Sequence, residues 1–131
     1  ILADSSYSSM KDIVGVRAAA RLGAFGKLLL PSALRAAELR ADFDAAAVSP
    51  ENAIAQARMP ILLIHSRTDE FTPAAHSEAI YANSDHSRTV LHVNEWGSGH
   101  ASDITTDFEA YRQLFNDFMA QYVPDFGLPL G

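Results

Sequence analysis

The chain has 131 residues, 48% of them hydrophobic and 20% charged, with a formal net charge of −6 and no cysteine. This length and composition predict a single domain with its own hydrophobic core. The acidic balance argues against nucleic acid or an anionic membrane as a partner. The lack of cysteine excludes a disulfide framework, a thiolate nucleophile and a cysteine-based metal site. No apolar run approaches the roughly 20 residues that a membrane-spanning helix needs, so we expect no membrane partner.

The first residues predict a short strand and then a helix. Residues 1–4 are apolar and end in a carboxylate, which is typical of a strand followed by a polar turn. Ser9 and Asp12 have the spacing of a helix start. We expect this helix to run from about Met10 to Leu22 and to end at Gly23. Because the chain opens inside a strand and without methionine, we expect a fragment or a processed chain.

A long helical excursion separates this strand from the next one. Residues 24–31 contain glycine-rich turns, and a second helix is expected over residues 32–42. Ser49 is followed by proline and an acid, which is a strong helix start, and this helix should end near Arg58. The excursion is longer than a simple crossover between parallel strands requires.

The stretch from Pro60 to Pro73 dominates the sequence. Residues 61–64 are an unbroken apolar run, which is typical of a strand buried on both faces of a parallel sheet. Residues 66–70 are polar and follow the carboxyl end of that strand, where open α/β sheets place their ligand sites. Asp69 is therefore the first candidate for chemistry.

The rest of the chain continues to alternate. The expected elements are a helix over 73–83, a strand over 88–94, a glycine-rich loop over 95–102, a last helix up to Tyr122, and a tail from Pro124. Thr106 and Glu109 form a capping box before the last helix. Strands that alternate with helices predict an α/β fold, with about three parallel strands in a three-layer α/β/α arrangement.

Asp69 and His100 follow two successive strands, so their loops should lie side by side at one end of the sheet. A carboxylate there accepts a hydrogen bond from one imidazole nitrogen and leaves the other nitrogen as a general base. Gly97 and Gly99 allow the histidine loop to fold tightly. The alternative is structural, with a turn-forming aspartate and a surface histidine. The joint pattern favours the catalytic interpretation.

The other histidines are weaker candidates. His65 and His92 lie within strands and are expected to be core residues with satisfied hydrogen bonds, whereas His76 and His86 are expected to be solvated. No His/Asp/Glu pair has convincing metal-ligand spacing, and there is no glycine-rich phosphate loop. We therefore expect no metal and no cofactor.

These motifs together resemble the C-terminal half of an α/β-hydrolase, the superfamily of esterases, lipases and peptidases. Pro60–Pro73 is similar to the seventh strand and acid loop of that fold, and residues 97–100 are similar to its histidine loop. Residues 1–4 would then be the sixth strand, and residues 7–58 would contain a lid-like helical insertion. The resemblance covers nearly all of residues 1–131, as one part of a single domain.

The resemblance implies an Asp69–His100 pair that serves a nucleophilic serine. Asp4 is a competing acid, because some lipases of this fold resemble a variant with the acid at that place. The nucleophile elbow Gly-x-Ser-x-Gly is absent, and no serine of this sequence fits it. Ser66 also stands where the family usually has glycine. The resemblance therefore places the serine and the oxyanion hole in an N-terminal half that precedes Ile1.

The expected function is a serine hydrolase of carboxylic esters that needs no cofactor, with a small acyl ester or a peptide as substrate. A peptidase of the same fold and a non-catalytic binding module remain alternatives. Trp96 and residues 28–30 are candidates for an acyl pocket or a lid face, or alternatively for core packing. The missing half is the expected partner. The open edge of so small a sheet leaves a homo-oligomer as a further alternative.

Overall fold

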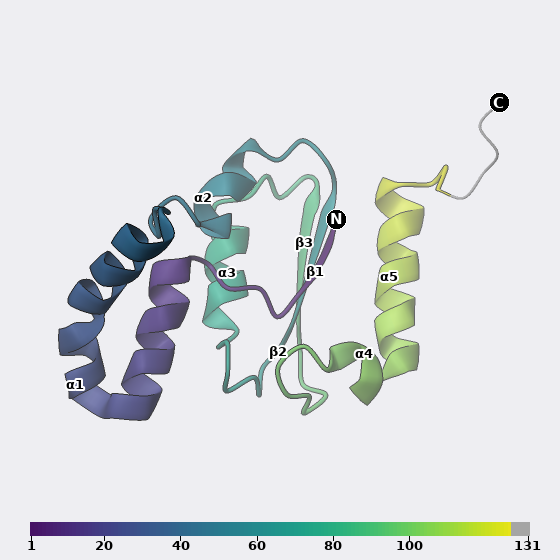
Figure 1. Ribbon diagram of the computed structural model, residues 1–131. Helices are drawn as coiled ribbons and strands as arrows, with labels where there is room; N and C mark the ends of the chain where they lie inside the picture. The colour runs from purple at the N-terminus through teal and green to yellow at the C-terminus, as the bar shows by residue number, and fades with distance from the viewer. Residues whose placement is uncertain (127–131) are drawn as a thin grey trace.

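Three parallel strands form a sheet at the centre of the protein (Figure 1). The computed structural model describes residues 1–126. The strands are β1 (Leu2–Asp4), β2 (Ile61–Ser66) and β3 (Thr89–Asn94), in the order β1-β2-β3. Both pairings are parallel. The three predicted strands and the α/β class are confirmed.

The central strand β2 is buried along its whole length because helices cover both faces of the sheet. Its side chains alternate between two apolar clusters. Ile61 and Leu63 pack with Ile54 and Ile80 on one face. The residues that pack together on the other face are Leu62, Ile64, Tyr111 and Phe118. Figure 1 shows α2 and α3 on one side of the sheet and α5 on the other, which gives the expected three layers.

Helix α1 (Met10–Ala41) begins where the sequence predicted, since the Ser9 side chain accepts a hydrogen bond from the backbone N–H of Asp12. Gly23, with φ 59° and ψ −140°, breaks the helical geometry and bends α1 into the two arms seen in Figure 1. The prediction of turns over residues 24–31 was wrong, because these residues are helical. Glycine adopts a positive φ without a steric penalty, so Gly23 allows this bend between two helical arms.

Three short helical elements complete the two crossovers. The helix α2 (Pro50–Ala53) and the 3₁₀ turn η1 (Ile54–Gln56) follow α1 and precede β2, and the helix α3 (Ala75–Ala82) connects β2 to β3. The Ser49 side chain accepts from the N–H of Asn52, so the predicted N-cap is present. Helix α2 ends earlier than the expected Arg58 and is followed by the 3₁₀ turn η1.

The C-terminal helices are α4 (Asp103–Thr106) and α5 (Phe108–Tyr122). The predicted capping box at Thr106 and Glu109 was wrong. Asp107 is the N-cap, and its carboxylate accepts from the N–H of Ala110. The Thr106 hydroxyl instead donates to the carbonyl of Ser102 within α4. Residues 127–131 of the predicted tail lie outside the described residues.

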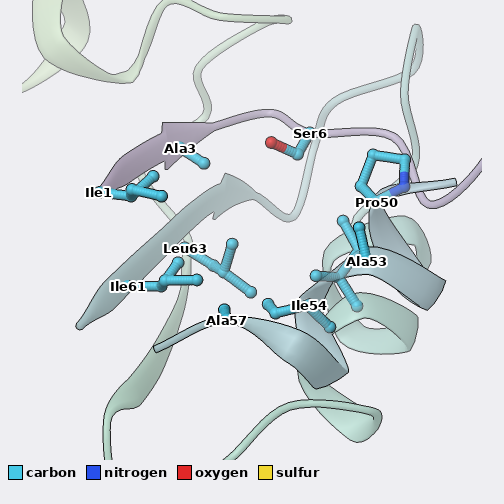
Figure 2. Close-up of a pocket in the computed structure, with 10 residues that line it drawn as sticks. Ile1, Ala3, Ser6, Pro50, Ala53, Ile54, Ala57, Ile61 and Leu63 are labelled. Carbon is cyan, nitrogen blue, oxygen red and sulfur yellow. The ribbon is translucent and has the colours of Figure 1, made fainter. Parts of the chain in front are cut away.

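Apolar surface remains open beside the edge strand β1. Figure 2 shows a pocket of about 260 Å³ between the sheet, where Ile1, Ala3 and Leu63 lie, and the helical residues Ala53 and Ile54. On the other face of the sheet, a second apolar pocket of about 370 Å³ lies between β1 and α5. Among the residues that the structure describes, no helix has both the length and the apolar character to cross a membrane.

Candidate active site

Asp69 lies in the acid loop, residues 67–73, which connects β2 to α3. Its Oδ1 accepts two backbone hydrogen bonds, from the N–H of Phe71 at 2.8 Å and from the N–H of Thr72 at 2.9 Å. The side chain has no exposed surface. A short aspartate turn of this kind folds the loop back on itself and fixes the direction of the carboxylate.

His100 lies in the histidine loop, residues 95–102, which connects β3 to α4. Its Nδ1 is 2.9 Å from Oδ2 of Asp69. The carboxylate accepts two amide hydrogen bonds on its other oxygen, so it is an acceptor here and Nδ1–H is the donor. In the neutral ring, Nε2 of His100 then carries no hydrogen and is an acceptor. The His100 side chain is 38% exposed, so the imidazole covers a buried carboxylate and still faces outward.

The environment of Asp69 keeps it ionised. Burial by itself would raise the pKa of the carboxyl group, but hydrogen bonds from the Thr72 N–H, His100 and the Phe71 N–H outweigh it and hold the pKa below the usual value. An ionised carboxylate at this place fixes the tautomer of His100 and stabilises its protonated form.

His65 supports the acid loop from below, at the centre of β2. Its Nε2 is 2.6 Å from the carbonyl oxygen of Thr72, and its Nδ1 is 2.7 Å from the Ser77 hydroxyl. A carbonyl only accepts, so Nε2 carries the hydrogen, and in the neutral ring Nδ1 accepts from Ser77. His65 is 0% exposed. The prediction of a core histidine with satisfied hydrogen bonds is therefore confirmed.

The acid loop and the histidine loop are tied to each other and to the end of β1. The Thr68 hydroxyl donates to the carbonyl of Ser98 at 3.0 Å. The backbone N–H of Ala101 donates to the Ser5 hydroxyl at 3.1 Å, and that hydroxyl donates to the carboxylate of Asp4 at 3.0 Å. Ser5 and Ala101 both have positive φ, 53° and 51°. The role of Ser5 was missed in the sequence, because nothing local signals a contact across 96 positions.

Comparisons with known proteins agree on the architecture. An esterase of Pyrococcus furiosus superposes with a TM-score of 0.60 and 19% identity over 92% of this chain and 43% of its own. An acylaminoacyl peptidase of Pyrococcus horikoshii superposes with a TM-score of 0.62 and 17% identity over 99% of this chain and 21% of its own. The chain has the fold of the C-terminal portion of an α/β-hydrolase.

One curated sequence is also similar. It is YqkD, an uncharacterized protein of Bacillus subtilis (strain 168), which is 32% identical over 91 residues, 70% of this chain and 29% of YqkD. No protein-family model matches the chain. The chain therefore spans less than half the length of each of these relatives.

In this α/β-hydrolase portion Asp4, the competing acid, does not contact His100 through any hydrogen bond of the described residues. Burial and the nearby charge of Asp103 raise the pKa of Asp4 to about 6. Asp103 is itself 0% exposed, and one of its oxygens accepts a short hydrogen bond from the Ser98 hydroxyl. Asp4, which is partly buried, and Asp103, which is fully buried, therefore form an acidic pair.

Two of the other three histidines differ from the expectation. His76 was expected to be solvated, and this was wrong, since it is only 7% exposed. Its Nδ1 accepts from the Ser8 backbone N–H at 3.3 Å and lies 2.8 Å from the Ser8 hydroxyl. His92 was expected in the core but is only half-buried, next to Trp96. His86 is exposed, as expected.

The candidates for an acyl pocket differ in burial. Trp96 packs against the apolar cluster on the α5 face of the sheet, which is the core-packing alternative. Leu28 and Leu29 are 72% and 44% exposed on the second arm of α1. Within residues 1–126, no group of His, Asp or Glu side chains has the arrangement of a metal site.

Proposed function

We propose that this chain is the C-terminal part of a serine hydrolase of carboxylic esters. The observation that carries the proposal is the hydrogen bond between Nδ1 of His100 and the buried carboxylate of Asp69, with the imidazole itself open to solvent on the other side. In this proposal His100 is the general base and then the general acid, and Asp69 orients it.

The chemistry follows from the free Nε2 of His100. This atom takes the proton of a serine hydroxyl as the oxygen attacks the ester carbonyl. The imidazolium, stabilised by Asp69, then donates the proton to the leaving alcohol, and an acyl-enzyme forms. Water, activated by the same nitrogen, releases the acid and restores the serine. An imidazole that alternates between its neutral and protonated forms, beside a carboxylate whose pKa is lowered, suits both steps.

The proposal takes the serine and the oxyanion hole from residues upstream of this chain. Two observations support this. The structure leaves apolar pockets open on both faces of the sheet beside β1, where a further strand and its helices would pack. The serine that lies against the histidine loop, Ser5, is buried, and its hydroxyl is already used by Asp4 and by the Ala101 N–H.

The proposal names an ester as substrate because an esterase has this fold. One solved protein with this fold is described as an esterase and another as an acylaminoacyl peptidase. The peptidase therefore stays the second candidate, because both reactions use the same serine, histidine and acid. A binding module without catalysis would need neither the ionised Asp69 nor the outward-facing His100.

The test uses the complete gene product, a fluorophosphonate probe that labels activated serines, and paired ester and anilide substrates with the same acyl group. We expect one labelled serine, upstream of Ile1 or on a polypeptide that co-purifies, and faster hydrolysis of the ester. His100→Ala should abolish labelling, and Asp69→Asn should lower kcat by about 10³-fold or more. The exposed His86→Ala serves as the matched control.

Three results would contradict the proposal. Labelling that survives His100→Ala would assign the base to another residue. No labelling and no turnover by the complete protein would favour the binding module, and preferential anilide cleavage would favour the peptidase.

A further inference from the structure

Three side chains from three separate segments are stacked at the candidate site. The guanidinium carbon of Arg17, on the first arm of α1, lies 4.0 Å from the ring centroid of Phe71 in the acid loop. The Phe71 ring in turn lies 4.7 Å from the imidazole of His100, tilted by 33°. Helix α1 therefore places a cation one aromatic ring away from the residue proposed as the general base.

The charge of Arg17 is not neutralised within the described residues. None of their carboxylates lies within 4.0 Å of its guanidinium, whereas several other arginines make such ion pairs: Arg35, Arg67, Arg88 and Arg112. Phe71 is 45% exposed, and Arg17 is partly exposed. A cation on an aromatic face keeps N–H donors at its edge, so the guanidinium remains able to take a carboxylate.

Helix α1 as a whole is cationic in an acidic protein. It contains six of the ten basic residues and two of the sixteen acidic residues, although the chain has a net charge of −6. The charge is therefore segregated, with a positive element next to the candidate site. Such a field raises the local concentration of anions and speeds their association.

We propose that Arg17 binds an anionic group of the substrate, so that the enzyme prefers esters that carry a carboxylate a few bonds from the scissile carbonyl. This inference rests on the proposed function, because it places the carboxylate beside the serine ester that His100 would act on. Arg17 offers parallel N–H donors that match the two oxygens of a carboxylate, and Phe71 holds the guanidinium plane in position.

The test compares two esters with acyl chains of the same length, p-nitrophenyl hexanoate and the mono-p-nitrophenyl ester of adipic acid, on the complete gene product. The quantity measured is the ratio of their kcat/KM values. We expect the native enzyme to favour the adipate ester, and Arg17→Gln to lower the ratio by about tenfold or more. Arg17→Lys should give a ratio between those of the native enzyme and Arg17→Gln, because lysine keeps the positive charge but lacks the parallel N–H donors of the guanidinium.

Arg21→Gln is the matched control, since Arg21 is exposed on the same helix and lies one turn further along. It should leave the ratio within about twofold. Added salt should reduce the preference of the native enzyme for the adipate ester and leave the ratio of Arg17→Gln nearly constant.

The outcomes separate the two proposals. If the hexanoate is hydrolysed and Arg17→Gln lowers both kcat/KM values equally, Arg17 only holds α1 against the acid loop, and the inference is wrong while the proposed function stands. If neither ester is hydrolysed and no serine is labelled, the proposed function is wrong, and the inference falls with it.

Discussion

His65 Nε2 lies 3.4 Å from Oδ2 of Asp69, the same oxygen that accepts the hydrogen bond from His100. Both side chains of this pair are fully buried. His65 donates its hydrogen to the Thr72 carbonyl, so it does not compete with His100 for the carboxylate. His65 thus fixes Thr72 in the acid loop, and the N–H of Thr72 donates to Asp69. The candidate site therefore depends on a histidine in the sheet that never meets solvent.

Replacing His65 should destabilise the protein. In His65→Leu the carbonyl of Thr72 and the hydroxyl of Ser77 lose their partner inside the core, and unpaired buried groups of this kind cost about 1–3 kcal/mol each. We expect the free energy of unfolding to fall by about 3 kcal/mol in urea denaturation. His86→Leu at an exposed position loses only a solvent-accessible hydrogen bond to the Tyr81 carbonyl and a stacking contact with Tyr81, so it should change the free energy of unfolding by about 1 kcal/mol or less. Equal effects of the two substitutions would show that the His65 hydrogen bonds contribute nothing.

Asp4 should make the stability fall as pH rises. Its pKa is raised to about 6 by burial and by the charge of Asp103, from 3.8 in an unfolded chain. Between these values the folded state binds more protons, so stability decreases with rising pH and the loss is complete above pH 6. In Asp4→Asn this loss should vanish. The variant should gain on the native protein by about 1 kcal/mol between pH 4 and 7, a figure reduced for solvent screening.

Urea titrations at several pH values measure this difference, and the exposed Asp125→Asn is the control. Parallel stability curves for Asp4→Asn and the native protein would show that Asp4 ionises normally.

Ser5 should act on catalysis through the histidine loop. Ser5→Ala removes the acceptor of the Ala101 N–H, next to His100, and the donor to Asp4. If the proposed function holds, we expect kcat to fall by about tenfold with KM nearly unchanged, because the base is displaced and the substrate pocket is not. Steady-state kinetics of the complete gene product check this. Ser6→Ala, at the neighbouring position, should retain kcat, and a rise in KM alone in Ser5→Ala would refute a positioning role.

His76 should make the protein acid-sensitive. Burial lowers its pKa below 6.5, and its Nδ1 must stay unprotonated to accept from the Ser8 N–H. Nearby Asp12, Asp69 and Glu51 favour protonation, and His65 opposes it, but burial prevails. A protein with a histidine buried in its neutral form loses stability as the pH falls below the pKa that this histidine has in the unfolded chain. We therefore expect the melting temperature to drop between pH 7 and 5, and to drop less in His76→Asn, whose amide oxygen can still accept from Ser8.

An identical pH response in His76→Asn and the native protein would show that His76 has no part in it. His86→Asn, at an exposed position, is the comparison variant.

Local patterns were sufficient for most elements of the fold. The apolar run before Asp69 predicted β2, because a strand covered on both faces needs apolar side chains at every position. The start of α1 at Ser9 and the N-cap at Ser49 were also predicted correctly, because a capping hydrogen bond spans only three residues. The error at Thr106 has the same origin, since Asp107 offered an equally good cap one residue later.

The sequence by itself determined the alternation of strands and helices and the two loops that carry Asp69 and His100. Both follow from short-range periodicity and from the rule that parallel strands end at one edge of a sheet. Only the tertiary structure decided that His100 bonds to Asp69 rather than Asp4, that His76 is buried on Ser8, and that Arg17 stacks on Phe71. Those contacts join residues far apart in the chain, and their energies depend on distance and burial, which no local pattern encodes.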